Sequence, residues 1–148
     1  MNKLILAILI AVSSFFAKAE SKQCRLPDKL SGYTLFFELS GMDYKVDPNT
    51  MALRKLSFSN NMIENESLTT GQLFKAYYVY STFPPDIAFI EVYRTSRLDT
   101  LLYRDILVCG TDIVGKLIYS PEASVKGFNL FEKPVTGKYI LKKTIELL

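Results

Sequence analysis

The residues best suited to chemistry are tyrosines, which recur with an arginine along four apolar runs between residues 73 and 119. Tyr78 and Tyr80 share one strand face, because strand side chains two apart point the same way. If that face lines a barrel, phenols converge with a guanidinium, and the pocket would bind a small ligand carrying an aromatic ring or a carboxylate. The ligand-binding residues predicted on this basis are Tyr78, Tyr80, Tyr93, Arg104 and Tyr119. Alternatively, these tyrosines fill the core and rim of a small β domain, since strands are rich in tyrosine.

Arg104 and Asp105 form a charged pair of neighbours between apolar residues. Adjacent strand residues face opposite ways, so the two side chains should not pair with each other. An inward member would need a partner and would be a candidate site residue. The alternative is a rim position where both side chains reach water. Glu91 could meet Asp105 across neighbouring strands, although a cross-strand pairing with lysine or arginine is the ordinary explanation.

Catalytic motifs are missing from the sequence. The chain has no histidine, which excludes Ser-His-Asp and Cys-His catalysis. No glycine-rich phosphate loop and no cysteine–histidine spacing for a metal is present, so no catalytic residue, metal or cofactor is predicted. Catalysis by tyrosine, arginine and a carboxylate stays open, but no spacing selects it.

The first 19 residues are predicted to be a secretory signal peptide. A short positive start precedes an apolar run over residues 4–16, and the small-x-small pattern at residues 17–19 places cleavage after Ala19. An uncleaved anchor is the alternative. The signal is typical of bacteria, so we expect a periplasmic or secreted protein with no membrane attachment after cleavage. The formal charge falls from +3 to +1 when Lys3 and Lys18 are removed, which leaves no electrostatic case for nucleic-acid binding.

The predicted export bears on whether the two cysteines form a disulfide. Cys24 and Cys109 are the only cysteines of the chain, and an oxidising compartment favours a disulfide between them. Such a bond would tie the mature N-terminus to the end of an apolar run over residues 101–109. Two separate buried thiols are the alternative.

Residues 20–148 are predicted to form a single β-rich domain, because short runs of alternating or β-branched and aromatic residues are separated by turn residues. The expected strands cover residues 30–39, 41–47, 53–59, 73–82, 87–95, 100–108, 113–120 and 126–131. Residues 60–70 are polar and are interpreted as a loop or a short irregular edge strand. Residues 138–148 fit either a closing strand or a helix, and the opening Tyr-Ile-Leu after Gly137 favours the strand. Gly115 lies inside a strand, where a bulge or a close backbone approach is expected.

Eight or nine short strands must bury their faces by closing into a barrel or by packing as two sheets. The motif Leu-Ser-Gly-Tyr-Thr-Leu at residues 30–35, followed by hairpin-connected strands with Gly115 in a late one, resembles a lipocalin-like (calycin) barrel. The resemblance implies an all-β fold, a single antiparallel meander closed into a small barrel. The lipocalin pattern begins with Gly-x-Trp, whereas this chain has no tryptophan, so no residue role is carried over. A β-sandwich is the alternative fold.

Two functions compete on the sequence alone. The first is a non-catalytic exported barrel that binds a small apolar or aromatic ligand. The second is a protein–protein interaction module, such as an immunity protein or an inhibitor of a secreted toxin or hydrolase. Small size, export and the lack of catalytic residues suit the second function as well as the first.

Overall fold

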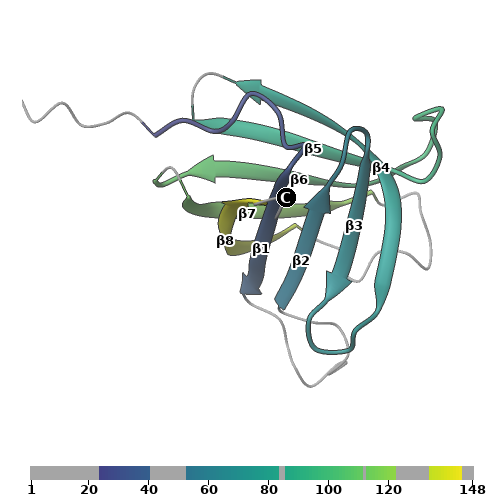
Figure 1. Cartoon of the computed structure of the whole chain (residues 1–148), viewed down its shortest axis with the longest axis horizontal. Helices are drawn as coiled ribbons and strands as arrows, with labels where there is room; N and C mark the ends of the chain where they lie inside the picture. Colours follow the sequence, from purple (N-terminus) through teal and green to yellow (C-terminus); the bar gives the residue numbers. More distant parts are fainter. Residues whose placement is uncertain (1–23, 41–52, 84–85, 112, 123–133, 145–148) are drawn as a thin grey trace, which may run out of the picture.

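Eight antiparallel strands form a closed barrel in which each strand pairs with its neighbours in the sequence and β8 pairs with β1. The computed structural model describes residues 24–40, 53–83, 86–111, 113–122 and 134–144. Figure 1 shows the meander, which has no helix in the described part of the chain. The strands are β1 (Tyr33–Ser40), β2 (Leu53–Phe58), β3 (Met62–Ser67), β4 (Leu73–Phe83), β5 (Ile87–Tyr93), β6 (Leu101–Cys109), β7 (Val114–Pro121) and β8 (Val135–Lys143). The predicted all-β barrel is confirmed, and the alternative of a β-sandwich is wrong.

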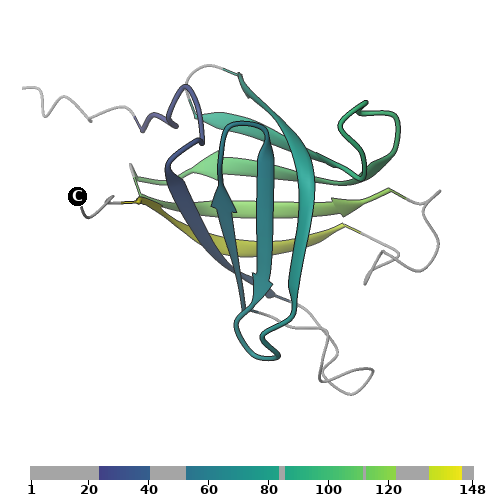
Figure 2. The same ribbon diagram turned by 45° about the vertical axis from the view of Figure 1, so that its right-hand side comes forward.

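Strict alternation of side chains explains why these strands close on one another. In β5, for example, Ala88, Ile90 and Val92 are fully buried while the residues between them are partly exposed. Strands with one apolar face must turn that face inward, and closure leaves no unpaired edge. Figure 2 shows β1, β2 and β3 crossing in front of β5 to β8 at a steep angle, with β4 curving from one group to the other. The inward faces of both groups share one core.

The closing pair is β1 with β8, the longest-range pairing in the barrel. Leu35 lies opposite Leu141, and Phe37 lies opposite Tyr139; all four side chains are buried. The ambiguous C-terminal run is therefore a strand over residues 138–143, and the helix alternative is wrong there. The apolar residues of this run favour the strand over the helix, because every second one faces inward and packs against an inward residue of β1.

Residues 60–70 differ from the expectation of a loop or an irregular edge. Residues 62–67 form β3, a regular strand paired with both β2 and β4. The run is polar because its outward residues are Glu64 and Glu66, which pair with Lys75 and Lys55, and because its inward residues include Asn65. Polar residues on the inward face interrupt the alternation of apolar and polar residues that predicts a strand, but the segment still forms one.

Several predicted segments lie outside the described residues. They are the signal peptide at residues 1–19, the strand at residues 41–47 and the strand at residues 126–131. Among the described residues, no helix is long and apolar enough to cross a membrane.

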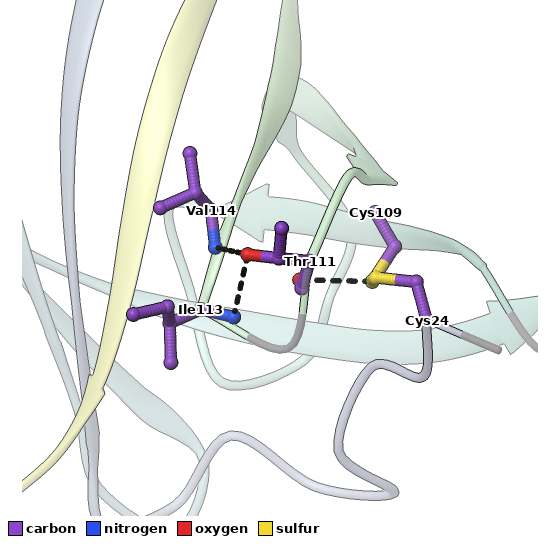
Figure 3. The surroundings of a disulfide bond; sticks show 5 residues. All are labelled: Cys24, Cys109, Thr111, Ile113 and Val114. Carbon is purple, nitrogen blue, oxygen red and sulfur yellow. Dashed lines mark hydrogen bonds between the residues drawn. A yellow bond between two sulfur atoms is a disulfide. The ribbon is translucent and has the colours of Figure 1, made fainter. Parts of the chain in front are cut away.

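The segment before β1 covers one end of the barrel. Leu26 and Leu30 are buried in the core, and the hydroxyl of Tyr80 donates a hydrogen bond to the Pro27 carbonyl at 2.8 Å. The predicted disulfide between Cys24 and Cys109 fixes this segment to the last residue of β6, with Cα atoms 5.9 Å apart (Figure 3). The N-terminal segment, the disulfide and the end of β8 thus lie at the same end of the barrel, which we call the tethered end.

Gly115 shows the close approach that the sequence predicted. A Cβ atom at this position would lie 2.2 Å from the carbonyl oxygen of Val108 and 2.5 Å from the hydroxyl of Tyr139. Tyr139 lies opposite Gly115 in the β7–β8 ladder, so its ring fills the space that a side chain would occupy. Glycine at this position lets a large aromatic side chain enter the interior.

Candidate ligand-binding site

Polar side chains gather inside the barrel in the half away from the tethered end. Arg54 enters from β2, Asn65 from β3, Tyr103 and Asp105 from β6, and Tyr119 from β7. Asn65, Tyr103, Asp105 and Tyr119 are buried, and Arg54 is partly buried. Tyr103 lies in the first half of β6 and Asp105 at its midpoint, whereas Cys109 ends that strand at the tethered end. These five residues are called the interior polar cluster.

A chain of hydrogen bonds links three members of the cluster across the barrel. Arg54 Nη1 donates to Asn65 Oδ1 at 3.1 Å, and Asn65 Nδ2 donates to the hydroxyl of Tyr103 at 3.2 Å. The amide therefore connects β2 with β6, which are not neighbouring strands in the ladder. Because Asn65 is buried, these bonds satisfy groups that would otherwise be costly to remove from water.

Asp105 is the exceptional residue of the cluster. Its side chain is fully buried, and neither carboxyl oxygen has a hydrogen-bond partner among the described residues. Burial raises the pKa of this carboxyl from 3.8 to about 8, and the positive charge of Arg54 opposes the rise only in part. Burying a carboxyl group without a hydrogen bond costs free energy, so such a group in a native structure needs an explanation. A bound ligand that donates hydrogen bonds to the carboxyl oxygens would be one.

Two tyrosines flank this carboxyl. Tyr119 lies directly opposite Asp105 in the β6–β7 ladder, and the rings of Tyr103 and Tyr119 lie 5.1 Å apart between centroids. Burial, and secondly the charge of Asp105, raise the pKa of both phenols above the ordinary value. Both therefore stay neutral across the physiological pH range and present aromatic faces and hydroxyls to the interior.

The predicted site residues separate into three groups. Tyr119 belongs to the interior polar cluster. Tyr78 and Tyr80 also face inward, but near the tethered end, where they line a shallow groove of about 320 Å³ with residues 28–31 and Asn60. Their hydroxyls already donate hydrogen bonds to the carbonyls of Ser59 and Pro27. Tyr80 therefore holds the covering segment, whereas Tyr78 holds the turn between β2 and β3.

Tyr93 and Arg104 lie on the outer face, which corrects the expectation that they converge with the inward tyrosines. Arg104 Nε donates to Glu91 Oε1 at 3.0 Å, and the hydroxyl of Tyr93 donates to the same carboxylate at 2.9 Å. The hydrogen bond from Arg104 is the main reason why the pKa of Glu91 is lowered. Glu91 does not meet Asp105, because the register places Asp105 opposite Ile90. The ordinary explanation, a cross-strand ion pair, applies to Glu91.

Sequence reasoning missed Arg54, Asn65 and Tyr103 as site residues. Arg54 shares a strand face with Leu56 and Phe58, two residues of the core, and this shared face was the available signal for an inward arginine. Asn65 was missed because its run was interpreted as a loop or a short irregular edge strand. Tyr103 shares a face with Asp105 two positions later, as the period of two requires.

No family model, curated protein or solved structure matches this chain. Within the part of the chain that the structure describes, no group of three or more cysteine and acidic side chains could hold a metal ion.

Proposed function

We propose that the protein is an exported barrel that binds a small ligand with an apolar or aromatic body, inside the half of the barrel that holds the interior polar cluster. The observation that carries this proposal is Asp105, a fully buried carboxyl without a hydrogen-bond partner among the described residues. Ligand sites combine apolar walls with a few placed polar groups. Asp105 and Tyr103 lie opposite Ile90 and Val92, two fully buried apolar side chains.

The size of the barrel supports the same function. An eight-stranded barrel has an interior that side chains can fill or that can hold one small ligand. The tethered end is covered by a segment with two buried leucines, so we place ligand entry at the opposite end. Export to an oxidising compartment is part of the proposal, and the bond between Cys24 and Cys109 is compatible with it.

A fluorescent apolar probe tests this function. N-phenyl-1-naphthylamine titrated into the processed, disulfide-bonded protein should bind saturably at one site per chain, with blue-shifted emission. The substitution Val92→Phe, which adds a larger side chain inside the barrel, should weaken binding of the probe. The substitution Phe89→Leu, on the outer face of the same strand, should not. Native mass spectrometry of freshly purified protein should detect any co-purified small molecule. Absence of saturable probe binding together with absence of a bound molecule would refute the proposal.

A protein-binding role is the second candidate, and one surface favours it. Val114 and Ile140 lie opposite each other on the outer face of β7 and β8 and are exposed. Next to them, Lys116 lies opposite Lys138, and neither lysine forms an ion pair with a described residue. Glu38 of β1 also lies opposite Lys138, so two lysines and one glutamate leave an excess of positive charge that an acidic protein partner would complement.

This second role has its own test. A toxin or hydrolase partner retained by immobilised protein should be lost from the Ile140→Asp variant and kept by the Glu91→Gln variant, whose substitution lies on another part of the outer face. Retention of the same partner by both variants would exclude this surface.

A further inference from the structure

We infer, on the basis of the proposed function, that the ligand carries an ammonium group and a carboxylate close together, as an α-amino acid does, with the ammonium at Asp105 and the carboxylate at Arg54. The inference deepens the proposed function because it names the chemical class of the ligand. It depends on two ionisable groups of the interior polar cluster, Arg54 and Asp105, neither of which forms an ion pair with a described residue.

The acidic half of this site is Asp105. A carboxylate accepts several hydrogen bonds, and neither oxygen of Asp105 accepts one from a described residue. An ammonium group supplies three donors and the compensating charge. The neighbouring rings of Tyr103 and Tyr119 present π faces that also attract a cation.

The basic half is Arg54. Its guanidinium has five N–H donors, and the hydrogen bond to Asn65 uses one nitrogen. The ion pairs of the described residues involve Arg25, Lys55, Lys75 and Arg104, so none of them engages Arg54. Among the described residues only Asn65 accepts a hydrogen bond from the Arg54 side chain, and a guanidinium is suited to two parallel hydrogen bonds with a carboxylate.

Arg54 and Asp105 do not neutralise each other. Their charges interact, because Arg54 opposes the rise in the pKa of Asp105. No hydrogen bond or ion pair joins the two groups, however, since Arg54 is held by Asn65, which is held in turn by Tyr103. The two groups are therefore near each other but separated. A ligand with both charges would pair each group, whereas a simple amine would leave Arg54 unpaired beside a second cation.

Four probes with the same phenyl ring separate the possible headgroups. They are L-phenylalanine with both charges, 2-phenylethylamine with the cation, 3-phenylpropionate with the anion and 2-phenylethanol with neither. Isothermal titration calorimetry on the processed protein at pH 8 should show L-phenylalanine binding at least about tenfold more tightly than each other probe, because each charged hydrogen bond is expected to contribute that much. Equal or tighter binding of 2-phenylethylamine, 3-phenylpropionate or 2-phenylethanol would overturn the inference.

Variants assign each charge to its residue. Asp105→Asn should reduce the affinity for L-phenylalanine to that for 3-phenylpropionate, and Arg54→Gln should reduce it to that for 2-phenylethylamine. The matched controls are Glu91→Gln and Arg104→Gln, which remove an acid and a base from the outer face and should leave affinity unchanged. Circular dichroism and thermal unfolding establish that each variant folds. Unchanged affinity in folded Asp105→Asn or Arg54→Gln protein would refute the assignment.

A pH titration of the unsubstituted protein gives a measurement that needs no variant. The charged and titratable groups around Asp105 are Arg54, Tyr103 and Tyr119, and only Asp105 changes charge between pH 5 and 8. Affinity for L-phenylalanine should fall as the pH is lowered through this range, whereas affinity for 3-phenylpropionate should not. If none of the four probes binds but N-phenyl-1-naphthylamine does, the inference fails and the proposed function stands. If that probe also fails to bind and native mass spectrometry detects no bound molecule, both fall.

Discussion

Replacing Asp105 with asparagine is expected to stabilise the protein by an amount that grows with pH. Asparagine has nearly the same shape as aspartic acid and cannot ionise. In the native protein the carboxyl is fully buried and has no hydrogen-bond partner among the described residues, so the charged form is strongly disfavoured. The substitution removes the cost of ionisation and leaves the packing unchanged.

The magnitude follows from the pKa of the carboxyl, which is about 8 in the folded protein and 3.8 ordinarily. Below pH 3.8 the folded and unfolded chains both hold the proton, so ionisation costs nothing. Between pH 3.8 and 8 only the unfolded chain releases the proton, so stability falls as the pH rises. At 1.36 kcal/mol for each pH unit, the loss reaches roughly 4 kcal/mol at pH 7 and about 5 to 6 kcal/mol above pH 8. Small domains are stable by only about 5–15 kcal/mol, so the effect is large.

Urea denaturation of ligand-free protein at several pH values between 4 and 9 measures this effect. The quantity of interest is the difference in the free energy of unfolding between the Asp105→Asn variant and the unsubstituted protein, because other ionisable groups cancel in that difference. It should be small at pH 4 and should rise to several kcal/mol at pH 8. Glu91→Gln is the matched control. The hydrogen bond from Arg104 lowers the pKa of Glu91, so its contribution is lost as the pH falls, and this variant should show a weak dependence of opposite sign.

A constant difference across the pH range would refute this reasoning. It would mean that Asp105 has an ordinary pKa in the folded protein and that its carboxyl is hydrated or paired in solution. A pH-dependent difference that disappears when L-phenylalanine is added would instead identify the ligand as the group that stabilises the ionised carboxyl.

Three further substitutions test the fold. Gly115→Ala should destabilise the barrel by about 1–3 kcal/mol in urea denaturation, because the added methyl meets the Val108 carbonyl; an unchanged midpoint would contradict the close approach. Leu98→Gly should be neutral or stabilising by up to about 1 kcal/mol, since Leu98 has a φ of 56°; a clear loss of stability would show that its side chain outweighs the backbone strain. Replacing Cys24 and Cys109 by serine should cost about 4–5 kcal/mol for a sequence separation of 85, and an unchanged thermal midpoint would show that the tether is dispensable.

Much of the fold could be predicted from local patterns. Residues 73–109 contain runs rich in β-branched and aromatic residues between short turns, and this arrangement favours antiparallel neighbours. The pairing of Cys24 with Cys109 and the close approach at Gly115 were also predicted correctly, because the chain has only two cysteines and because a glycine inside a strand marks such an approach. The strand β3 was expected to be a loop or an irregular edge strand, since its inward residues Asn65 and Ser67 are polar and buried and match no apolar period.

The site was predicted less well for a different reason. Alternation assigns the residues of a strand to two faces but does not say which face is inside the barrel. Arg104 was therefore expected in the interior, and Asp105 was considered only as the alternative inward residue. Burial of Leu107 and Tyr103 on the same face as Asp105 decides the question. A strand cannot present adjacent residues to one side, and Arg104 therefore points to water and pairs with Glu91.

By itself, the sequence determined that the chain forms short antiparallel strands with one apolar face and a cysteine pair able to tether them. Only the tertiary structure decided that β1 closes against β8, and that Asn65 meets Tyr103 across 38 residues of sequence while Asp105 finds no hydrogen-bond partner among the described residues. The physical reason is that strand periodicity acts over two residues, whereas the stagger and closure of a barrel depend on all eight strands together. Side chains that meet across the interior are placed by that closure, which no single segment encodes.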